Sequence, residues 1–567
     1  MSQATQVFNP HPQPSNETAE EQAEAASSGV ATPTAMRAAP SMATSAVIVG
    51  LAFVMSRILG LGREVILANA FGTGREMDAY VSAFRIPDLL FLVVMAGSFG
   101  AAFIPVFGEY LTNGDQERAW RLASAVLTWA GIGVLVMSAV CFVLARPLMF
   151  LVAPGFDDET ADMAVNLMRI LLLSPVFLGF GIAAKGILEA HHQFTLPALA
   201  PLLYNVAIII GALFFVEDHG IYAVGWAVII GALGHFLIQV PGLLRAGIRF
   251  RPTISRQVEG LGEVTRLLGP RVIGSAAFQF NFIAVNAFAS TSADEHVSAI
   301  NYAWQLLMLP HGVLALSIST VVFPSLAALY SHGDNDGFRS MLDRALRPLL
   351  FLSVPAGIGL LLLREPIVRV IFESGDFDRA STRLVIAPLA WFAFGLIGYA
   401  LTEILTRVFY ATRDTRTPVV TGVLTVILNL LLCMLFIDTL GYTGLALALS
   451  ATTSAEAVIL LLFLRERIGP IFSPGFTGWM VRVAAAGAVM AAIILVTAPT
   501  LERVLEADGS SRIQAYLLFV YAMGLYVLSF VLAAYMLRIP ELQQMTGKVA
   551  RRLPGGLRHP LERIGLA

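Results

Sequence analysis

Charged residues are scarce in this chain of 567 residues. They make up 13% of it, about half of the share that is usual in soluble domains. Hydrophobic residues make up 57% and the mean hydropathy is +0.74, so a soluble fold would lack the polar side chains to cover its surface. Because the apolar residues come in long runs and do not alternate with polar ones, the composition predicts an all-α polytopic membrane protein.

The sequence also lacks the residue patterns of common chemical sites. No set of His, Cys and carboxylate residues has metal-ligand spacing, and no Gly-Lys loop of the kind that cradles phosphate is present. The two cysteines, Cys141 and Cys433, lie within apolar runs and predict buried thiols. With a net charge of −2, we expect no nucleic-acid partner. These absences favour a protein that is not an enzyme and holds no cofactor.

Long apolar segments dominate what is present. Residues 1–41 are rich in Ala, Ser, Pro, Thr and Glu and predict a disordered cytoplasmic tail. Fourteen apolar segments follow, most of them long enough to cross about 30 Å of hydrocarbon. Their expected spans are 43–70, 77–110, 119–146, 161–189, 196–216, 221–244, 268–290, 297–330, 345–372, 382–410, 417–437, 442–464, 478–500 and 514–537.

Charges in the connecting segments predict the orientation. Arginine is concentrated in the connectors 245–271 and 407–416, and basic residues recur in the C-terminal tail. By the positive-inside rule, these connectors and both termini are expected in the cytoplasm. The alternate connectors are acidic, as at Asp157-Asp158-Glu159, Glu217-Asp218 and Asp294-Glu295.

An internal repeat divides the chain into two similar halves. Phe103-Ile104-Pro105 leads to Gly114-Asp115, and about 220 residues later Val322-Phe323-Pro324 leads to Gly333-Asp334. Two six-helix units of the same topology are typical of transporters that bind substrate between the lobes and rock to give alternating access. The expected division is an N-lobe over 42–246, a C-lobe over 247–467, helices 13 and 14 over 468–540, and a basic tail over 541–567.

Several charged side chains fall inside the predicted membrane segments, where they mark a cavity, a partner or water. The first interpretation is a cationic wall on a central cavity that suits a pyrophosphate or another anion. The alternative is that the arginines reach an interface or pair with nearby carboxylates. The richest group lies in the first two segments and consists of Arg57, Arg63, Glu64, Asp78, Arg85 and Asp88.

Other polar residues of the membrane segments leave similar alternatives. Lys185 and Arg271 are expected at interfaces, and Glu403 with Arg407, four residues later, predicts an ion pair on one helix face. The seventh segment's Gln279, Asn281 and Asn286 either line the cleft or bond between helices. The same holds for Asn429, Thr452 and Thr453, where a sodium site is one possibility.

Ordered sequence motifs run through the first part of the chain. They are Ser56-Arg57-Ile58-Leu59-Gly60-Leu61-Gly62-Arg63-Glu64, Phe71-Gly72-Thr73-Gly74, Asp78-Ala79, Phe84-Arg85-Ile86-Pro87-Asp88-Leu89-Leu90, Gly97, Ala102-Phe103-Ile104-Pro105-Val106-Phe107 and Ala153-Pro154-Gly155-Phe156. Together they resemble the MurJ/MviN family of the multidrug/oligosaccharidyl-lipid/polysaccharide exporter superfamily. The resemblance covers about residues 43–540.

The resemblance implies a fourteen-helix flippase of the bacterial plasma membrane. Its cargo would be lipid II, the undecaprenyl-pyrophosphate-linked peptidoglycan precursor, moved from the cytoplasmic to the outer leaflet for cell-wall synthesis. By the family pattern, Arg57 and Arg63 meet the pyrophosphate, and helices 13 and 14 hold the lipid tail. The full set of expected cargo-binding residues is Arg57, Arg63, Ser56, Glu64, Asp78, Asp88, Arg85, Ser298 and Gln305.

The chain also departs from the family pattern. Phe91 and Gln305 stand where many members carry arginine, and Ala96 and Met308 stand where many carry acids. The expected cavity is therefore less charged, unless Arg85, Arg271 or Lys185 compensates.

Two rival functions share the fold: a flippase for another polyprenyl-linked oligosaccharide, and an ion-coupled small-molecule exporter. A membrane glycosyltransferase is disfavoured because the predicted outer loops are short. Membrane potential, proton and sodium remain open as the coupling force. The expected partners are the cargo and membrane lipid, and the sequence names no protein partner.

Overall fold

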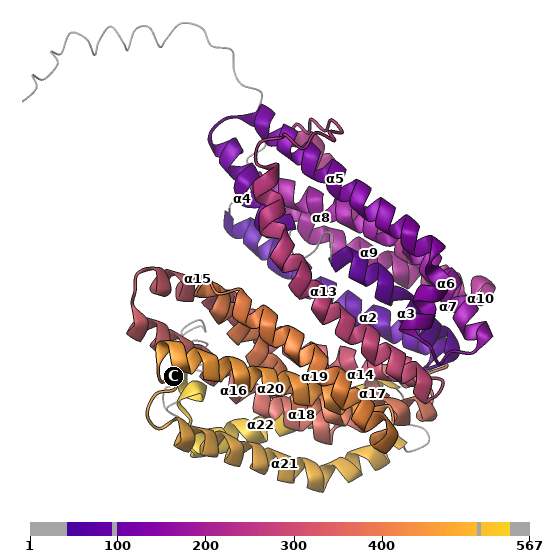
Figure 1. Cartoon of the computed structure of the whole chain (residues 1–567). Helices are drawn as coiled ribbons and strands as arrows, with labels where there is room; N and C mark the ends of the chain where they lie inside the picture. Colours follow the sequence, from indigo (N-terminus) through magenta and orange to yellow (C-terminus); the bar gives the residue numbers. More distant parts are fainter. Residues whose placement is uncertain (1–41, 93–98, 507–511, 545–567) are drawn as a thin grey trace, which may run out of the picture. The chain divides into compact units, whose positions relative to one another are not determined.

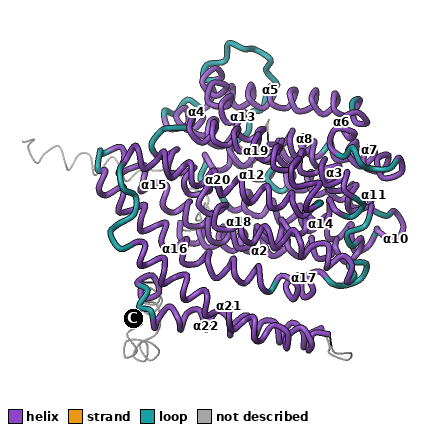
Figure 2. The backbone as a smooth tube through the Cα atoms, turned by 60° about the horizontal axis from the view of Figure 1, so that its bottom comes forward, coloured by secondary structure: helices purple, strands orange, loops and turns teal. Residues whose placement is uncertain are grey.

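The computed structural model describes residues 42–92, 99–506 and 512–544, which form helices joined by loops (Figure 2). In this part of the chain the only β pairing is an isolated bridge between Ser374 and Phe377. The all-α prediction is confirmed. The described residues from Ile48 onward form one compact unit, to which the packing described below belongs.

The first half of the chain forms one helical bundle. Its tightest packing joins α9 to α11, α8 to α11 and α3 to α7. Its helices are α2 (Met42–Phe71), α3 (Arg75–Phe91), α4 (Phe99–Thr112), α5 (Gln116–Val143), α6 (Ala145–Val152), α7 (Asp158–Leu171), α8 (Ser174–Ala190), α9 (Thr195–Phe214), α10 (Val216–His219), α11 (Ile221–Leu237) and α12 (Val240–Arg245).

The second half forms another bundle, in which α18 packs against α20 and α19 against α20. Its helices are α13 (Leu261–Ser292), α14 (His296–His311), the π-helical turn η2 (Gly312–Leu316), α15 (Ser317–Ser331), α16 (Asn335–Leu362), α17 (Arg364–Phe372), α18 (Arg379–Ala411), α19 (Arg416–Leu440) and α20 (Thr443–Ile468). Helix α13 contacts both bundles, with α3 and α4 on one side and α19 on the other (Figure 1).

The sequence repeat recurs in local geometry. Gly114 and Gly333 both adopt a positive φ, 76° and 72°, which favours glycine. The aspartate after each caps the next helix: Asp115 accepts a hydrogen bond from the Arg118 N–H, and Asp334 accepts one from the Gly337 N–H. Two loops that match in sequence therefore start α5 and α16 in the same way.

Eleven helical stretches of the described residues are long and apolar enough to cross a membrane. Each overlaps one of the fourteen expected segments, so the polytopic prediction is confirmed. The largest shift is at the segment expected over 345–372, which the structure has as Asn335–Leu362. The other three expected segments overlap α2, the pair α3 and α4, and α13. Because residues 93–98 between α3 and α4 lie outside the described part, the count of fourteen stays a prediction.

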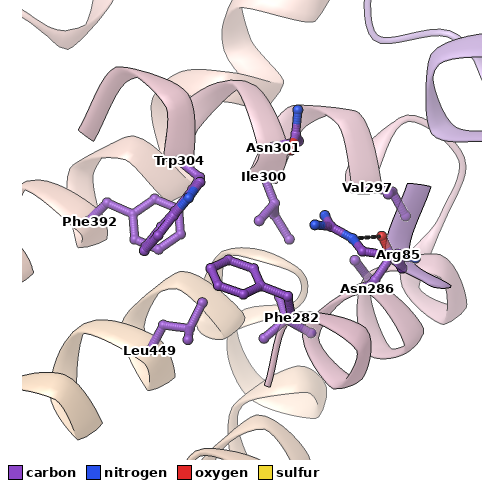
Figure 3. Close-up of a pocket in the computed structure, with 11 residues that line it drawn as sticks. Arg85, Phe282, Asn286, Val297, Ile300, Asn301, Trp304, Phe392 and Leu449 are labelled. Atoms are coloured by element: carbon purple, nitrogen blue, oxygen red, sulfur yellow. Dashed lines mark hydrogen bonds between the residues drawn. The ribbon is translucent and has the colours of Figure 1, made fainter. Parts of the chain in front are cut away.

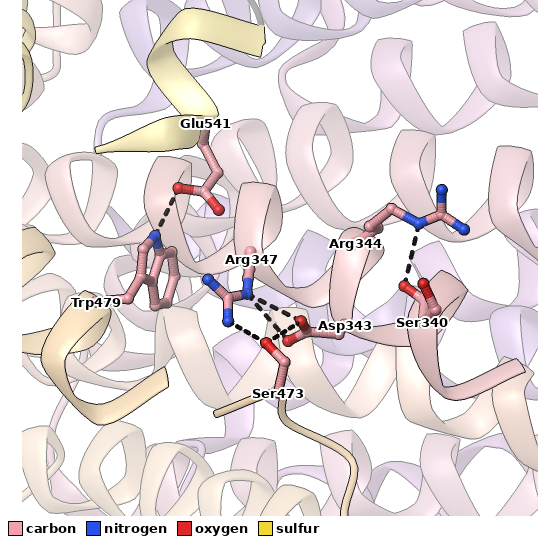
Figure 4. A network of polar contacts seen from close by, with 7 residues as sticks. All are labelled: Ser340, Asp343, Arg344, Arg347, Ser473, Trp479 and Glu541. Atoms are coloured by element: carbon pink, nitrogen blue, oxygen red, sulfur yellow. Dashed lines mark hydrogen bonds and ion pairs between the residues drawn. The ribbon is translucent and has the colours of Figure 1, made fainter. Parts of the chain in front are cut away.

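The last two helices, α21 (Phe476–Glu506) and α22 (Arg512–Met536), pack on each other and against α16 and α17. A polar network fastens them to the second bundle (Figure 4). Asp343 of α16 accepts from Arg347 at 3.1 Å and from the Ser473 hydroxyl at 2.8 Å. The Arg347 guanidinium lies 5.3 Å from the Trp479 ring, whose N–H donates to Glu541. The network thus joins α16, the loop before α21, α21 and the segment after α22.

We expect Asp343→Ala to loosen this attachment, because Arg347 would lose the carboxylate that neutralises it. A hydrogen bond to a charged group contributes about 1.5–3 kcal/mol, so the apparent melting temperature of the purified protein in detergent should fall. Asp336→Ala is the matched control, since Asp336 pairs with Arg339 on the same helix but is 95% exposed. Equal melting temperatures for the two variants would contradict the assignment.

Candidate functional site

Arg63 of α2 is already paired. Its Nη2 lies 2.5 Å from Oε1 of Glu64, and its Nη1 donates to Oδ1 of Asn205 on α9 at 3.3 Å. Neighbouring helix residues point about 100° apart, so the long arginine side chain folds back to reach the glutamate. Of the two alternatives left by the sequence, pairing with a nearby carboxylate therefore describes Arg63 in this structure.

Arg57, about two turns earlier on α2, is placed differently. Its guanidinium lies 5.4 Å from the Phe53 ring centroid, and no carboxylate lies within 4 Å of it in the described part of the chain. It also approaches the second bundle, because a Cβ added to Gly312 would lie 3.7 Å from its nitrogen. Arg57 is thus a cation between the bundles whose charge is available to an anion, and Ser56 beside it is half-buried.

Arg85 of α3 is held by a neutral side chain. Its Nε donates to Oδ1 of Asn286 on α13 at 3.1 Å. Asn286 in turn donates to the Ser82 hydroxyl at 2.9 Å and to the Val152 carbonyl at 3.1 Å. Because the partner is uncharged, the positive charge of Arg85 is not cancelled there; Asp88 lies within electrostatic reach of both Arg85 and Arg63.

A small pocket opens beside Arg85 (Figure 3), and the empty space of about 330 Å³ around it includes open solvent. One end is polar, with Arg85 and Asn286, and the other is aromatic, where the Phe282 and Trp304 rings meet edge to face at 5.0 Å. Such a mixed lining suits a ligand with an anionic group and an apolar face. Gln305 is half-buried and does not line the cavity. The lining residues are Arg85, Phe282, Val285, Asn286, Ala289, Val297, Ile300, Asn301, Trp304, Phe392 and Leu449.

Asp78 and Ser298, two further expected cargo contacts, lie elsewhere and join the bundles. Both carboxylate oxygens of Asp78 accept backbone N–H bonds from the start of α14, one from Ser298 at 2.7 Å and one from Glu295 at 2.8 Å. A carboxylate stabilises a helix N-terminus, and here it comes from the other half of the chain. The Ser298 hydroxyl returns a bond to the Thr73 carbonyl at 2.8 Å.

More contacts surround this junction, which we call the acidic-end joint. The Asp376 N–H donates to the Asn69 carbonyl at 2.8 Å. Arg75 lies 3.0 Å from Asp294 and 3.5 Å from Asp157. Hydrogen bonding with Thr160, together with the charge of Arg75, lowers the pKa of Asp157, so this ion pair persists in mildly acidic medium. The joint comprises Asn69, Thr73, Arg75, Asp78, Gly155, Asp157, Ser290, Asp294, Glu295, Ser298, Gly375 and Asp376.

Two glycines allow the backbones to meet at the joint. The Gly155 N–H donates to the Ser290 hydroxyl at 3.2 Å, and a Cβ at Gly155 would collide with the Ser290 carbonyl. Gly375 adopts a φ of 58°, and a Cβ there would collide with Asn69. Only residues without a side chain permit this approach.

The structure therefore separates the expected site residues into two places. One group lies on α2 and α3, beside α13 and α9, and consists of Arg57, Arg63, Glu64, Arg85 and Asp88. Asp78 and Ser298 instead form contacts of the acidic-end joint. The predicted pair of Glu403 and Arg407 is present at 2.9 Å. No group of three or more potential metal ligands occurs in the part of the chain that was described.

Sequence reasoning missed several participants, namely Asn205, Thr73, Gly375 and the backbone of α14. Thr73 stood in a noted motif, but nothing near it in sequence identifies its partners. Those partners lie more than 200 residues away in the chain.

We expect Asp78→Asn to weaken the joint, because an amide offers one acceptor where the carboxylate offers two. Losing a charged hydrogen bond costs about 1.5–3 kcal/mol, so the open form should gain about tenfold or more. The measurement is the labelling rate of Ser290→Cys by a membrane-impermeant thiol reagent, in a chain whose own cysteines are alanine.

Asp334→Asn is the matched control for this measurement. It alters a helix-capping aspartate of the same kind, at the start of α16 and within one bundle. An increase in labelling by both variants, or by neither, would rule out a specific role of Asp78 in closing the joint.

Comparison with known proteins agrees with this architecture. The family model described as "Lipid II flippase MurJ" matches residues 67–509. The chain is 32% identical over 450 residues to the lipid II flippase MurJ of Burkholderia cenocepacia, covering 78% of this chain and 87% of that protein. It is 29% identical over 463 residues to the probable lipid II flippase MurJ of Vibrio cholerae, covering 80% and 88%.

Solved structures share the fold. A lipid II flippase MurJ in an inward closed conformation superposes with a TM-score of 0.72 at 24% identity, covering 87% of this chain and 99% of that one. An inward-facing multidrug resistance transporter of the MATE family gives 0.63 at 16% identity, with coverage of 75% and 98%. The protein is a multi-pass bacterial membrane protein, and the matched family model and relatives show that the chain belongs to the lipid II flippase MurJ family.

Proposed function

We propose that this protein is a transporter that carries lipid II from the cytoplasmic to the outer leaflet by alternating access. The observation that carries the proposal is Arg57: a guanidinium between the two bundles, without a carboxylate partner in the described residues, in a chain whose curated relatives are named lipid II flippases. A pyrophosphate is the anion that such a cation binds well, through charge-assisted hydrogen bonds.

Arg57, Arg63 and Arg85 differ in whether their guanidinium groups are free to bind this cargo. Arg57 can bind the pyrophosphate at once, whereas Arg63 has to leave Glu64 before it can turn to the cargo. Arg85 keeps its charge beside a cavity with aromatic walls, where a sugar can stack through its apolar face. A change of partner at Arg63 gives the cargo a differential effect on two states, which is what a ligand needs to shift an equilibrium.

The joint sets which side is open. By the charge of its loops the acidic end faces outward, and both termini then face the cytoplasm. With the joint closed, cargo enters between the bundles from the cytoplasmic side. The joint consists of single hydrogen bonds and exposed ion pairs, each of modest strength, so the binding free energy of the cargo suffices to release it.

The lipid tail has a place beside the second bundle. Helices α21 and α22 lie outside the repeat and expose many large apolar side chains, among them Val496, Leu517, Tyr521 and Met536. A polyprenyl chain can remain in lipid along these helices while its head group crosses between the bundles.

A second cargo is supported by one observation. Phe91 and Gln305 stand where the family resemblance leads us to expect arginine, and Arg85 is the one cation among the described residues that line the cavity. A head group with less negative charge, on another polyprenyl-linked oligosaccharide, would be compatible with the three arginines that are present.

The test is complementation together with transport. The wild type should restore growth to a bacterium depleted of its own lipid II flippase, and it should move lipid II across reconstituted vesicles. Arg57→Ala should reduce transport about tenfold or more, as expected for loss of a charge-assisted contact of about 1.5–3 kcal/mol. The level of the Arg57→Ala variant in the membrane and its melting temperature should stay unchanged, because no carboxylate partner is left unpaired by the loss of Arg57.

Arg63→Ala needs a companion variant, because it leaves Glu64, which is 6% exposed, as a buried unpaired charge that destabilises the fold. The double variant Arg63→Ala with Glu64→Gln should recover stability but not transport. Arg121→Ala, which removes an exposed arginine from α5, is the matched control. Full transport by Arg57→Ala would reject the cationic site, and transport of another polyprenyl-linked saccharide instead of lipid II would select the second cargo.

A further inference from the structure

Glu456 is a carboxylate in the middle of a membrane helix that the cargo site does not use. Helix α20 runs from Thr443 to Ile468 and is one of the candidate spans. At 1.5 Å per residue, Glu456 lies about 18–20 Å from either end. An ionisable residue at this depth is costly, and such residues commonly mark ion or proton pathways.

No cation compensates this carboxylate in the described residues. The hydroxyl of Thr425 on α19 lies near it, but this hydroxyl donates to the Thr421 carbonyl at 2.9 Å. Gly422 gives it room, because a Cβ added there would lie 3.7 Å from Oε1. A half-buried carboxylate within a membrane segment, without a cation, is stabilised most simply by binding a proton.

The described helices packed against α20 present no other group at this depth that competes with Glu456 for a proton. From α18, the Tyr399 hydroxyl is buried without a hydrogen-bond partner among the described residues, and a phenol holds its proton more strongly than a carboxylic acid does. Glu403 and Arg407, on the same helix, pair with each other. From α19, Cys433 is buried beside Asn429, and α13 presents the neutral Asn281 to Asn429.

A polar stripe leads from one membrane face to Glu456. It consists of Thr417, Thr421, Thr425 and Asn429, which are four residues apart and therefore lie on one face of α19. At its outer end Thr417 donates to Asp414 at 2.6 Å, and Asp414 pairs with Arg467 at the exposed end of α20. This end carries the arginine-rich connector that we place in the cytoplasm.

At the inner end of the stripe, one polar atom of Asn429 lacks a hydrogen bond. Asn429 is fully buried and donates to Oδ1 of Asn281 at 2.6 Å. Its own Oδ1 has no hydrogen-bond partner. A buried amide oxygen of this kind is satisfied by a water or by another donor, which provides a polar position one turn beyond Thr425.

We propose that Glu456 is the proton site of this transporter, loaded along the polar stripe from the face at which Asp414 lies, and that its protonation state controls how α19 packs against α20. When Glu456 is protonated, its carboxyl group packs against Thr425 and Gly422 without intervening water. When it is ionised, water has to enter between α19 and α20 to hydrate it, which favours a different arrangement of the second bundle. The claim that this proton drives lipid II movement rests on the proposed function, whereas the proton site itself does not.

The first measurement is transport of lipid II into vesicles with and without an imposed proton gradient. The wild type should respond to a gradient of one pH unit, which supplies a bias of about tenfold per proton. Glu456→Gln mimics the protonated acid, so it should keep its basal flipping and lose the response. Glu456→Asp should restore part of it. Glu466→Gln, on the exposed end of the same helix, should behave as the wild type.

The second measurement is independent of cargo. Infrared difference spectra of the purified protein, recorded between acidic and alkaline pH, should contain the carbonyl band of one protonated carboxylic acid. That band should be absent in Glu456→Gln and present in Glu466→Gln.

The outcomes separate the two proposals. A response to the gradient that survives in Glu456→Gln, a response to sodium in place of protons, or an infrared band that Glu456→Gln leaves unchanged would overturn the proton site. If the wild type moves no lipid II, the proposed function fails, and the infrared band alone decides on Glu456. Glu456→Gln with its basal flipping intact is folded, so loss of its response then supports the site.

Discussion

The cost of placing charge in hydrocarbon organises this molecule. An ionised side chain inside a membrane needs a partner, a cavity or water, and the described charges of α2 and α3 illustrate each solution. Arg63 is neutralised by Glu64, Arg85 is held by an amide, and Asp78 is stabilised by two backbone N–H groups of another helix. Arg57, in contrast, has no carboxylate partner among the described residues. The same cost that makes the others structural makes Arg57 the natural contact for an anionic ligand.

The joint follows from the same constraint. Asp78 is buried in one bundle, and the groups that stabilise it belong to the other, so separating the bundles exposes a carboxylate that must then be hydrated. Water at the membrane surface can do this, since the joint lies at the end of the helices, among Arg75, Asp157 and Asp294. The joint is therefore strong enough to define a closed state and weak enough to open. A junction of large apolar side chains would not combine these properties.

The sequence predicted much of the fold because its signals are local. Apolar runs located the eleven confirmed spans, and the spacing of Glu403 and Arg407 predicted their ion pair. The matched Gly-Asp pairs predicted a repeat, and the structure shows that both pairs start a helix in the same way. The candidate site was only partly predictable. That Arg63 would meet Asn205, and that Asp78 would cap α14, depends on how the helices are placed in space. No periodicity or spacing encodes a contact between residues that are more than a hundred positions apart.

The bare backbone contact at Gly155 and Ser290 has a consequence for the cell as well as for the protein. A membrane that stores energy as an ion gradient tolerates no leak through its carriers. At Gly155 and Ser290 two backbone segments meet without an intervening side chain, which is the closest approach that a seal at this end can make. A single methyl group at position 155 would collide with the Ser290 carbonyl and hold the two segments apart. The tightness of the closed end therefore depends on the absence of one side chain.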